Sequence, residues 1–178
     1  AEVPLISLQL SAPVPIMPED HSLESNQAEE AASAEITPAD VRLAAMNLLA
    51  RREHSVRELR NKLKRRFPDD SMIDEQIARL TGQNLQSNLR FAESYARQRI
   101  GRGYGPVRVR EELRERGASG LDIASAMKEL QVDWFAAASE VILKKFGALA
   151  PSDIKEKARR ARFMQYRGFT AEHYQKLL

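Results

Sequence analysis

Hydrophobic side chains recur along most of the chain at intervals of three and four residues, the spacing of an α-helix that buries one face. After Ser55, which begins a capping-box pattern, the apolar positions are Val56, Leu59, Leu63 and Phe67, and the residues between them are largely basic. A sustained alternation of apolar and polar residues, typical of a half-buried strand, occurs nowhere in the sequence. The sequence therefore predicts an all-α fold without a β-sheet.

One segment of this helical pattern occurs three times, at residues 60–66, 110–116 and 161–167. The copies superpose without gaps on three apolar residues that lie 50 and 51 positions apart, which we term the anchors: Leu63, Leu113 and Met164. Glycine follows the second and third copies at once, as expected where a helix stops. A gapless match of this length indicates a true internal repeat.

Each copy of the repeat contains three predicted helices. N-cap residues stand six positions past the anchors, at Asp69, Ser119 and Thr170, and an apolar helix precedes each anchor, beginning near Val41, Phe91 and Trp134. The predicted repeats span residues 37–84, 85–131 and 132–178. We expect neighbouring repeats to share apolar faces and to stack into an elongated, curved array. The alternative is a compact nine-helix bundle with degenerate repeats.

The first 36 residues, which we term the leader, differ in composition from the rest. They hold four of the eight prolines, no glycine and no aromatic residue, and residues 1–40 contain eight acids and no lysine or arginine. The leader has too little apolar surface for its burial to offset the entropy lost when the chain is ordered. The sequence therefore predicts that the leader is disordered. The alternative is that residues 3–16 dock as an extended peptide on a partner or on the basic remainder of the chain.

Several classes of function are excluded by the residues present. With no cysteine, the chain has no disulfide, zinc thiolate, iron–sulfur ligand or thiol nucleophile. The three histidines, His21, His54 and His173, lack the spacing of a metal site. The glycine-rich segment 101–106 has no preceding strand and no Lys-Ser/Thr ending, so it is not a phosphate-binding loop. We therefore expect no enzyme, metal or cofactor.

Charge is the remaining signal. Of the 25 acids, eight lie in residues 1–40, so the other 138 residues carry 28 basic and 17 acidic side chains, an excess of 11 positive charges. This excess is spread over all three repeats, and no helix carries the signature of a duplex-reading recognition helix. Such a long positive field suits a long anionic partner: a nucleic acid, an acidic protein surface or a nucleoprotein filament.

Three segments of this sequence resemble the RecX family, bacterial regulators of the RecA recombinase: residues 55–63, 103–113 and 166–169. The most specific of their features is the Gly-Tyr-Gly-Pro turn at 103–106, which leads into an arginine-rich helix. The resemblance covers about residues 39–178, and Asp133-Trp134 fits the start of the third unit. Two departures stand out: residues 84–88 supply amides and a hydroxyl where the family usually has an acidic pair, and the leader has no counterpart.

The resemblance implies a non-enzymatic modulator that binds along the groove of the RecA filament on single-stranded DNA. Such a protein opposes filament extension and inhibits ATP hydrolysis, strand exchange and co-protease activity, and thereby moderates recombinational DNA repair and the SOS response. The alternatives are a general basic nucleic-acid-binding helical-repeat protein and an adaptor for an unrelated acidic protein. We expect a monomer, because no coiled-coil heptads demand a dimer, located in the cytoplasm, because no apolar run approaches a membrane span.

The predicted binding surface for RecA or DNA combines basic side chains of the anchor helices with the glycine-rich turn. Its members are Arg57, Arg60, Lys64, Arg102, Tyr104, Arg108, Arg110, Arg114, Arg116, Arg159 and Arg162. Within the turn, the glycines permit positive φ and Pro106 begins the next helix, which holds Tyr104 near the arginines. The alternative for Tyr104 is that it packs between helices.

Overall fold

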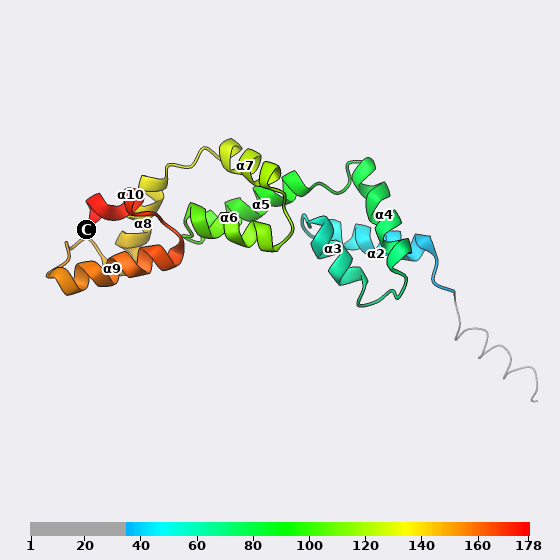
Figure 1. Ribbon diagram of the computed structural model, residues 1–178, viewed down its shortest axis with the longest axis horizontal. Helices are drawn as coiled ribbons and strands as arrows, with labels where there is room; N and C mark the ends of the chain where they lie inside the picture. The colour runs from blue at the N-terminus through cyan, green and yellow to red at the C-terminus, as the bar shows by residue number, and fades with distance from the viewer. Residues whose placement is uncertain (1–34) are drawn as a thin grey trace, which may run out of the picture. The chain divides into compact units, whose positions relative to one another are not determined.

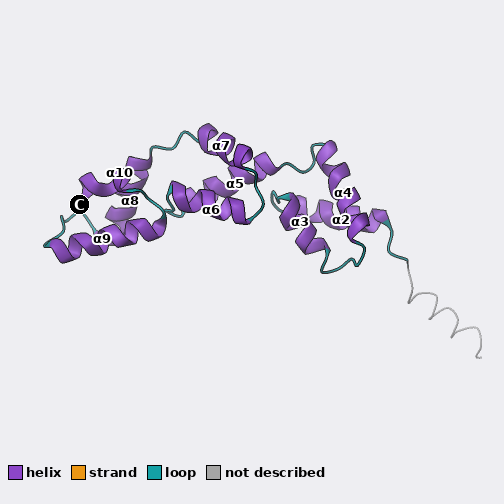
Figure 2. Cartoon of the chain, viewed as in Figure 1, coloured by secondary structure: helices purple, strands orange, loops and turns teal. Residues whose placement is uncertain are grey.

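The computed structural model describes residues 35–178, so the predicted leader lies outside the described residues except for its last two positions. Within the described part every regular element is helical, and no strand occurs there (Figure 2). The all-α prediction is confirmed for these residues. None of their helices is long and apolar enough to cross a membrane.

The described helices form three groups of three, which Figure 1 labels in chain order. The first domain contains α2 (Pro38–Leu49), α3 (Val56–Leu63) and α4 (Asp70–Gly82). The second contains α5 (Asn88–Gly101), α6 (Pro106–Glu115) and α7 (Gly120–Glu129). The third contains α8 (Trp134–Phe146), α9 (Ile154–Arg167) and the short α10 (Ala171–Tyr174), followed by a 3-10 turn, η2 (Gln175–Leu177).

The helix ends follow the local signals in the sequence. Thr37 forms a capping box with Asp40, and the side chains of Asp69 and Ser119 accept hydrogen bonds from backbone N–H groups three residues on. Gly117 and Gly168 follow α6 and α9 with φ of 89° and 88°, the left-handed conformation that glycine adopts at little cost. The register of the repeats is therefore set locally, by caps and stops.

Each domain has its own apolar core. The anchors Leu63, Leu113 and Met164 are buried in three separate clusters, and each cluster draws its buried residues from one domain. The expectation that neighbouring repeats share apolar faces is therefore wrong for these buried residues. The reason is that two companion helices cover the apolar stripe of each anchor helix. The main helix packing also stays within domains, which argues against a single nine-helix bundle.

Candidate partner-binding surface

The anchor helices α3, α6 and α9 meet end to end through polar contacts. At the junction between the second and third domains, the backbone N–H groups of Gly105 and Val107 donate to the carbonyls of Arg167 (2.8 Å) and Gly168 (3.1 Å). The start of α6 thereby satisfies carbonyls at the end of α9. The start of α6 in the second domain thus contacts the end of α9 in the third.

The first junction repeats this arrangement. Ser55, the N-cap of α3, donates its hydroxyl proton to the carbonyl of Arg116 at the end of α6, at 2.6 Å. A Cβ on Gly117 would lie 2.7 Å from Cβ of Arg57, and a Cβ on Gly168 would overlap the backbone of Arg108. Glycine is therefore required at both positions for two reasons: it adopts the positive φ, and it leaves space for the anchor helix of the preceding domain to approach closely.

The close approach of another backbone segment also explains why residue 105 is a glycine, a position where the sequence suggested a need for positive φ. Its φ is −81°, which any residue adopts, and only Gly103 in the glycine-rich turn has a positive φ. A Cβ at Gly105 would overlap the backbone of Gly168 and Phe169. The glycine is therefore needed for space.

A polar cluster around Glu58 reinforces the first junction. The Glu58 side chain is 11% exposed, and its carboxylate accepts hydrogen bonds from Arg52 (2.8 Å) and from Arg116 (2.6 Å), which comes from the second domain. Burial raises the pKa of Glu58, but the hydrogen bonds from Arg116 and Arg52 outweigh it, so the pKa lies below its ordinary value. Only half of the predicted capping box forms here. The Ser55 side chain caps α3, whereas the carboxylate of Glu58 binds the arginines at the junction instead of the backbone of Ser55.

The segment that departs from the family pattern completes this junction. Gln86, 1% exposed, donates from its amide to the carbonyl of His54 at 3.1 Å, and Asn88 accepts from the backbone N–H of Val56 at 3.0 Å. Ser87 caps α5 by accepting from the N–H of Arg90. The hydroxyl of this segment therefore caps a helix, and its amides bind the first domain.

At the second junction Tyr104 lies within a group of arginines. The guanidinium carbons of Arg99, Arg108 and Arg167 lie 3.8, 4.7 and 5.0 Å from the centre of its ring. Glu112 neutralises part of this charge by accepting hydrogen bonds from Arg99 and Arg108, the latter at 3.0 Å. Tyr104 thus packs between helices of two domains, the alternative that the sequence left open.

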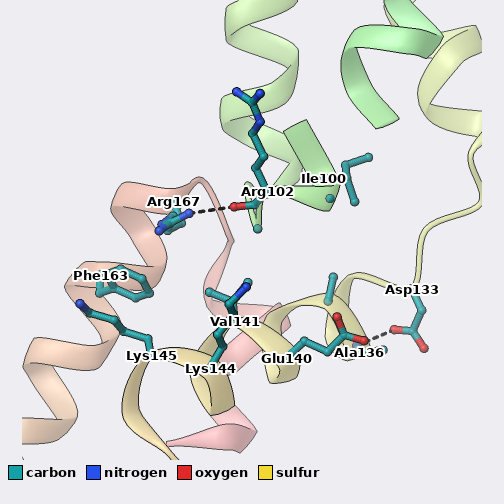
Figure 3. A pocket seen from close by; sticks show the side chains of 13 residues that line it. Ile100, Arg102, Asp133, Ala136, Glu140, Val141, Lys144, Lys145, Phe163 and Arg167 are labelled. Atoms are coloured by element: carbon teal, nitrogen blue, oxygen red, sulfur yellow. Dashed lines mark hydrogen bonds between the residues drawn. The ribbon is translucent and has the colours of Figure 1, made fainter. Parts of the chain in front are cut away.

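Two hollows are lined by cations that make no ion pair within the described residues 35–178. The larger, of about 650 Å³, lies between the end of α5 and helices α8 and α9. Arg167 donates a hydrogen bond to the carbonyl of Arg102 at 3.0 Å. Figure 3 shows this contact, with Lys145 and Phe163 to one side of the hollow and Glu140 and Asp133 to the other. The lining of this hollow therefore mixes cationic and acidic side chains.

The smaller hollow, of about 340 Å³, lies between α6 and α7 beside the first residue of α8. Its lining includes three cations, Arg110, Arg114 and Lys128, together with Trp134, and no acidic residue. Lys128 and Trp134 were absent from the residues predicted as binding surface. No motif in the sequence marks them, because only the folding of α7 and the start of α8 against α6 brings them beside Arg110 and Arg114.

Models of the three domains of one family match this chain in order. The model for the first three-helix domain of RecX matches residues 42–80, the second 87–127 and the third 131–178. The chain belongs to the RecX family.

Curated relatives agree with the family match. A protein named Regulatory protein RecX from Pseudomonas entomophila (strain L48) is 44% identical over 142 residues, covering 80% of this chain and 92% of the relative. The protein of the same name from Pseudomonas putida (strain GB-1) is 43% identical over 142 residues, covering 80% and 91%. The RecX family is one of non-enzymatic regulatory proteins, as the sequence resemblance implied.

Two solved RecX structures share the fold. A crystal structure of regulatory protein RecX has a TM-score of 0.64 and 22% identity, covering 84% of this chain and 75% of that one. A crystal structure of RecX from Lactobacillus salivarius has a TM-score of 0.64 and 19% identity, covering 78% and 92%. At this level of identity, the likeness concerns the fold.

In this RecX chain the predicted binding residues divide by their contacts. Five pair with carboxylates of the chain itself: Arg60, Lys64, Arg108, Arg116 and Arg159. Five others are exposed and make no ion pair among residues 35–178: Arg57, Arg102, Arg110, Arg114 and Arg162. The second group is available to a partner without breaking an internal contact, and it stays a prediction. Within residues 35–178 no group of side chains could hold a metal ion.

Proposed function

We propose that this RecX protein binds the RecA filament on single-stranded DNA and restrains it. It opposes filament extension and inhibits ATP hydrolysis, strand exchange and co-protease activity, and so moderates recombinational repair and the SOS response. The observation that carries this proposal is the match of all three RecX domains, in order, to one chain. RecA and its DNA are the partners that the family implies, and the site of action is the cytoplasm, where the protein acts as a monomer.

The junctions suit a partner that itself repeats. Backbone hydrogen bonds at the second junction, side-chain hydrogen bonds at the first and close glycine contacts at both join the anchor helices, so the basic surfaces of successive domains keep a fixed relation to one another. Exposed cations that make no ion pair within residues 35–178 occur in every domain, for example Arg57, Arg114 and Arg162. Weak contacts on joined domains add through effective concentration, so the whole chain binds a polymer more tightly than any single domain.

Inhibition in this scheme needs no catalytic group. A protein that binds one arrangement of a filament more tightly than another shifts the filament toward that arrangement by the difference in binding free energy. Contacts that bridge neighbouring recombinase protomers and DNA would favour a filament that no longer extends. This accounts for several activities falling together, because all of them depend on the same filament.

The test is the DNA-dependent ATPase of the recombinase. We expect substoichiometric amounts of this protein to lower the steady-state rate of ATP hydrolysis on single-stranded DNA. An unchanged rate at equimolar protein contradicts the proposal. Binding to DNA alone is measured in parallel between about 50 and 200 mM salt. Tight, steeply salt-dependent binding without any effect on the recombinase would favour the general nucleic-acid-binding alternative.

A further inference from the structure

The first domain shows how a pair of cations on the anchor helix is neutralised. Arg60 lies on α3, and Lys64, one turn later, is the C-cap residue of that helix. Arg60 donates to both carboxylate oxygens of Asp74, with Nη2–Oδ2 at 2.8 Å, and Nζ of Lys64 lies 2.6 Å from Oδ2 of Asp70. The two carboxylates are themselves one turn apart on α4. Two cations on one helix thus meet two carboxylates at the same spacing on another.

The second domain keeps the cations and lacks the carboxylates. Superposing the anchors Leu63 and Leu113 brings Arg110 and Arg114 onto Arg60 and Lys64. The same register brings Gly120 and Ala124 onto Asp70 and Asp74. Ile73 and Ile123, which lie between the paired positions, are both buried, so the register holds in the structure. Arg110 and Arg114 make no ion pair within residues 35–178.

The third domain serves as an internal comparison. Its residues at the cation positions are Ala161 and Gln165, and those at the carboxylate positions are Ala171 and Gln175. In the third domain the cations and the carboxylates are both absent, as expected if these ion pairs serve only structure and were lost together. Among the described domains, the second alone keeps the cations and omits the acids.

The missing carboxylates leave an open space. Gly120 and Ala124 both line the hollow of about 340 Å³ that also contains Arg110 and Arg114. A Cβ added at Gly120 would meet nothing within 4 Å. Lys128 adds a third cation, and Trp134 supplies an aromatic wall. The hollow therefore offers three cations and an apolar wall, with no acidic side chain in its lining.

This arrangement is unfavourable for the isolated chain. Like charges one turn apart on a helix repel each other, and Lys128 adds to the positive field. In the first domain the carboxylates of α4 relieve the same repulsion. A partner that supplies acids would relieve it in the second.

We propose that the hollow between α6 and α7 binds an acidic helix of the protein component of the filament. Two carboxylates of that helix, one turn apart, take the roles that Asp70 and Asp74 play in the first domain. The apolar part of the same helix lies against Trp134. This rests on the proposed function, because it assigns the surface that meets the recombinase. Carboxylates are favoured over nucleic-acid phosphates because the chain itself pairs this cation motif with carboxylates at helical spacing.

The decisive variant supplies the missing acids from within the chain. Gly120→Asp/Ala124→Asp gives Arg110 and Arg114 the partners that Arg60 and Lys64 have. We expect the variant to fold with an unchanged or higher melting temperature and to bind the recombinase filament at least about tenfold more weakly. Gly120→Asn/Ala124→Asn fills the same space without charge and should bind the filament much as the natural chain does.

The matched charge control uses the third domain. Ala171→Asp/Gln175→Asp adds the same two charges at the equivalent positions, both exposed, where no cation of the anchor helix faces them. We expect filament binding to change less than about twofold. Equal weakening by this control and by Gly120→Asp/Ala124→Asp would overturn the site, because the effect would then follow net charge.

Two further experiments distinguish a carboxylate-bearing helix from nucleic acid as the occupant of the hollow. They also test this site independently of the proposed function. Binding of a single-stranded oligonucleotide alone should be unchanged in Gly120→Asp/Ala124→Asp, and its loss would overturn the carboxylate assignment in favour of phosphates. A helical peptide with two glutamates one turn apart should bind the natural full-length chain more tightly than its glutamine counterpart, and should lose this preference in the variant. If that preference is absent, the site is refuted even where ATPase inhibition stands. If it is present without ATPase inhibition, the proposed function alone fails.

Discussion

The backbone N–H of Gly105, at the start of α6, donates a hydrogen bond of 2.8 Å to the carbonyl of Arg167, at the end of α9. Sixty-two positions separate the two residues in the sequence. Through this bond and its neighbour from Val107, the second domain satisfies the open end of a helix in the third. The joint is thus made by the backbone, and its main requirement is space for two chains to approach.

Replacing Gly105 with alanine should therefore loosen the second junction. The backbone conformation suits alanine, so the effect comes from overlap with the backbone of Gly168. Overpacking of this kind costs about 1–3 kcal/mol. We expect urea unfolding to show that loss. Gly101→Ala, where the added Cβ meets nothing within 4 Å, should cost nothing measurable, and equal effects of the two variants would contradict this account.

Glu58→Gln should weaken the first junction. The substitution removes the charge that Arg52 and Arg116 share at 2.8 and 2.6 Å, and hydrogen bonds involving charged groups contribute about 1.5–3 kcal/mol. Denaturant unfolding should reveal a loss near the lower end of that range. The control is Glu75→Gln, which removes an exposed pair with Arg79 and should cost less than about 0.5 kcal/mol. A Glu58 variant as stable as the control would refute the role of this cluster.

His54 makes the stability of the fold sensitive to pH. Burial, aided by the charge of Arg52, holds the pKa of His54 below its ordinary 6.5 despite the nearby Glu58. The unfolded chain therefore takes up a proton that the folded chain does not as the pH falls through 6.5, and stability decreases by at most about 1.4 kcal/mol per pH unit from this group. Unfolding at pH 7.5, 6.5 and 5.5 should show the decrease, and His54→Gln should lessen it. An identical pH profile in the variant would refute the assignment.

Glu156 should titrate unusually low. The backbone N–H of Ser152 and the guanidinium of Arg160 both donate to its carboxylate, which lowers the pKa of Glu156 from 4.5 to about 2. Its contribution to stability is therefore full above pH 4.5 and is lost between about pH 4.5 and 2. NMR titration of the side-chain carboxyl should show the shift. A midpoint near 4.5 would mean that the contacts with Ser152 and Arg160 do not persist in solution.

The sequence predicted the repeat because its signals are local. Apolar spacing around Leu113, the cap at Ser119 and the stop at Gly117 each act within a few residues, so they can be read in order. The junctions could not be predicted in the same way. No short-range sequence pattern indicates that Arg116 contacts Glu58, because that ion pair depends on how the folded first and second domains pack against each other.

The candidate surface was predicted in part for the same reason. Composition identified the arginines but did not separate Arg108, which is held by Glu112 and the carbonyl of Tyr166, from Arg110, which has no such partner within residues 35–178. A comparison between repeats does distinguish the paired Arg60 from Arg110, because Asp74, which pairs with Arg60, is replaced by Ala124 in the second domain. The information was present in the sequence, in the differences between its copies.

If this protein restrains extension of the recombinase filament, its effect should be visible in the growth of single filaments. Filaments of fluorescent RecA are followed on long single-stranded DNA molecules, with and without substoichiometric amounts of this protein. We expect growth to slow or stop when the natural protein is added, and to continue largely unimpeded when the Gly120→Asp/Ala124→Asp variant is added instead. Filaments that grow at an unchanged rate in the presence of equimolar natural protein would contradict the proposed function.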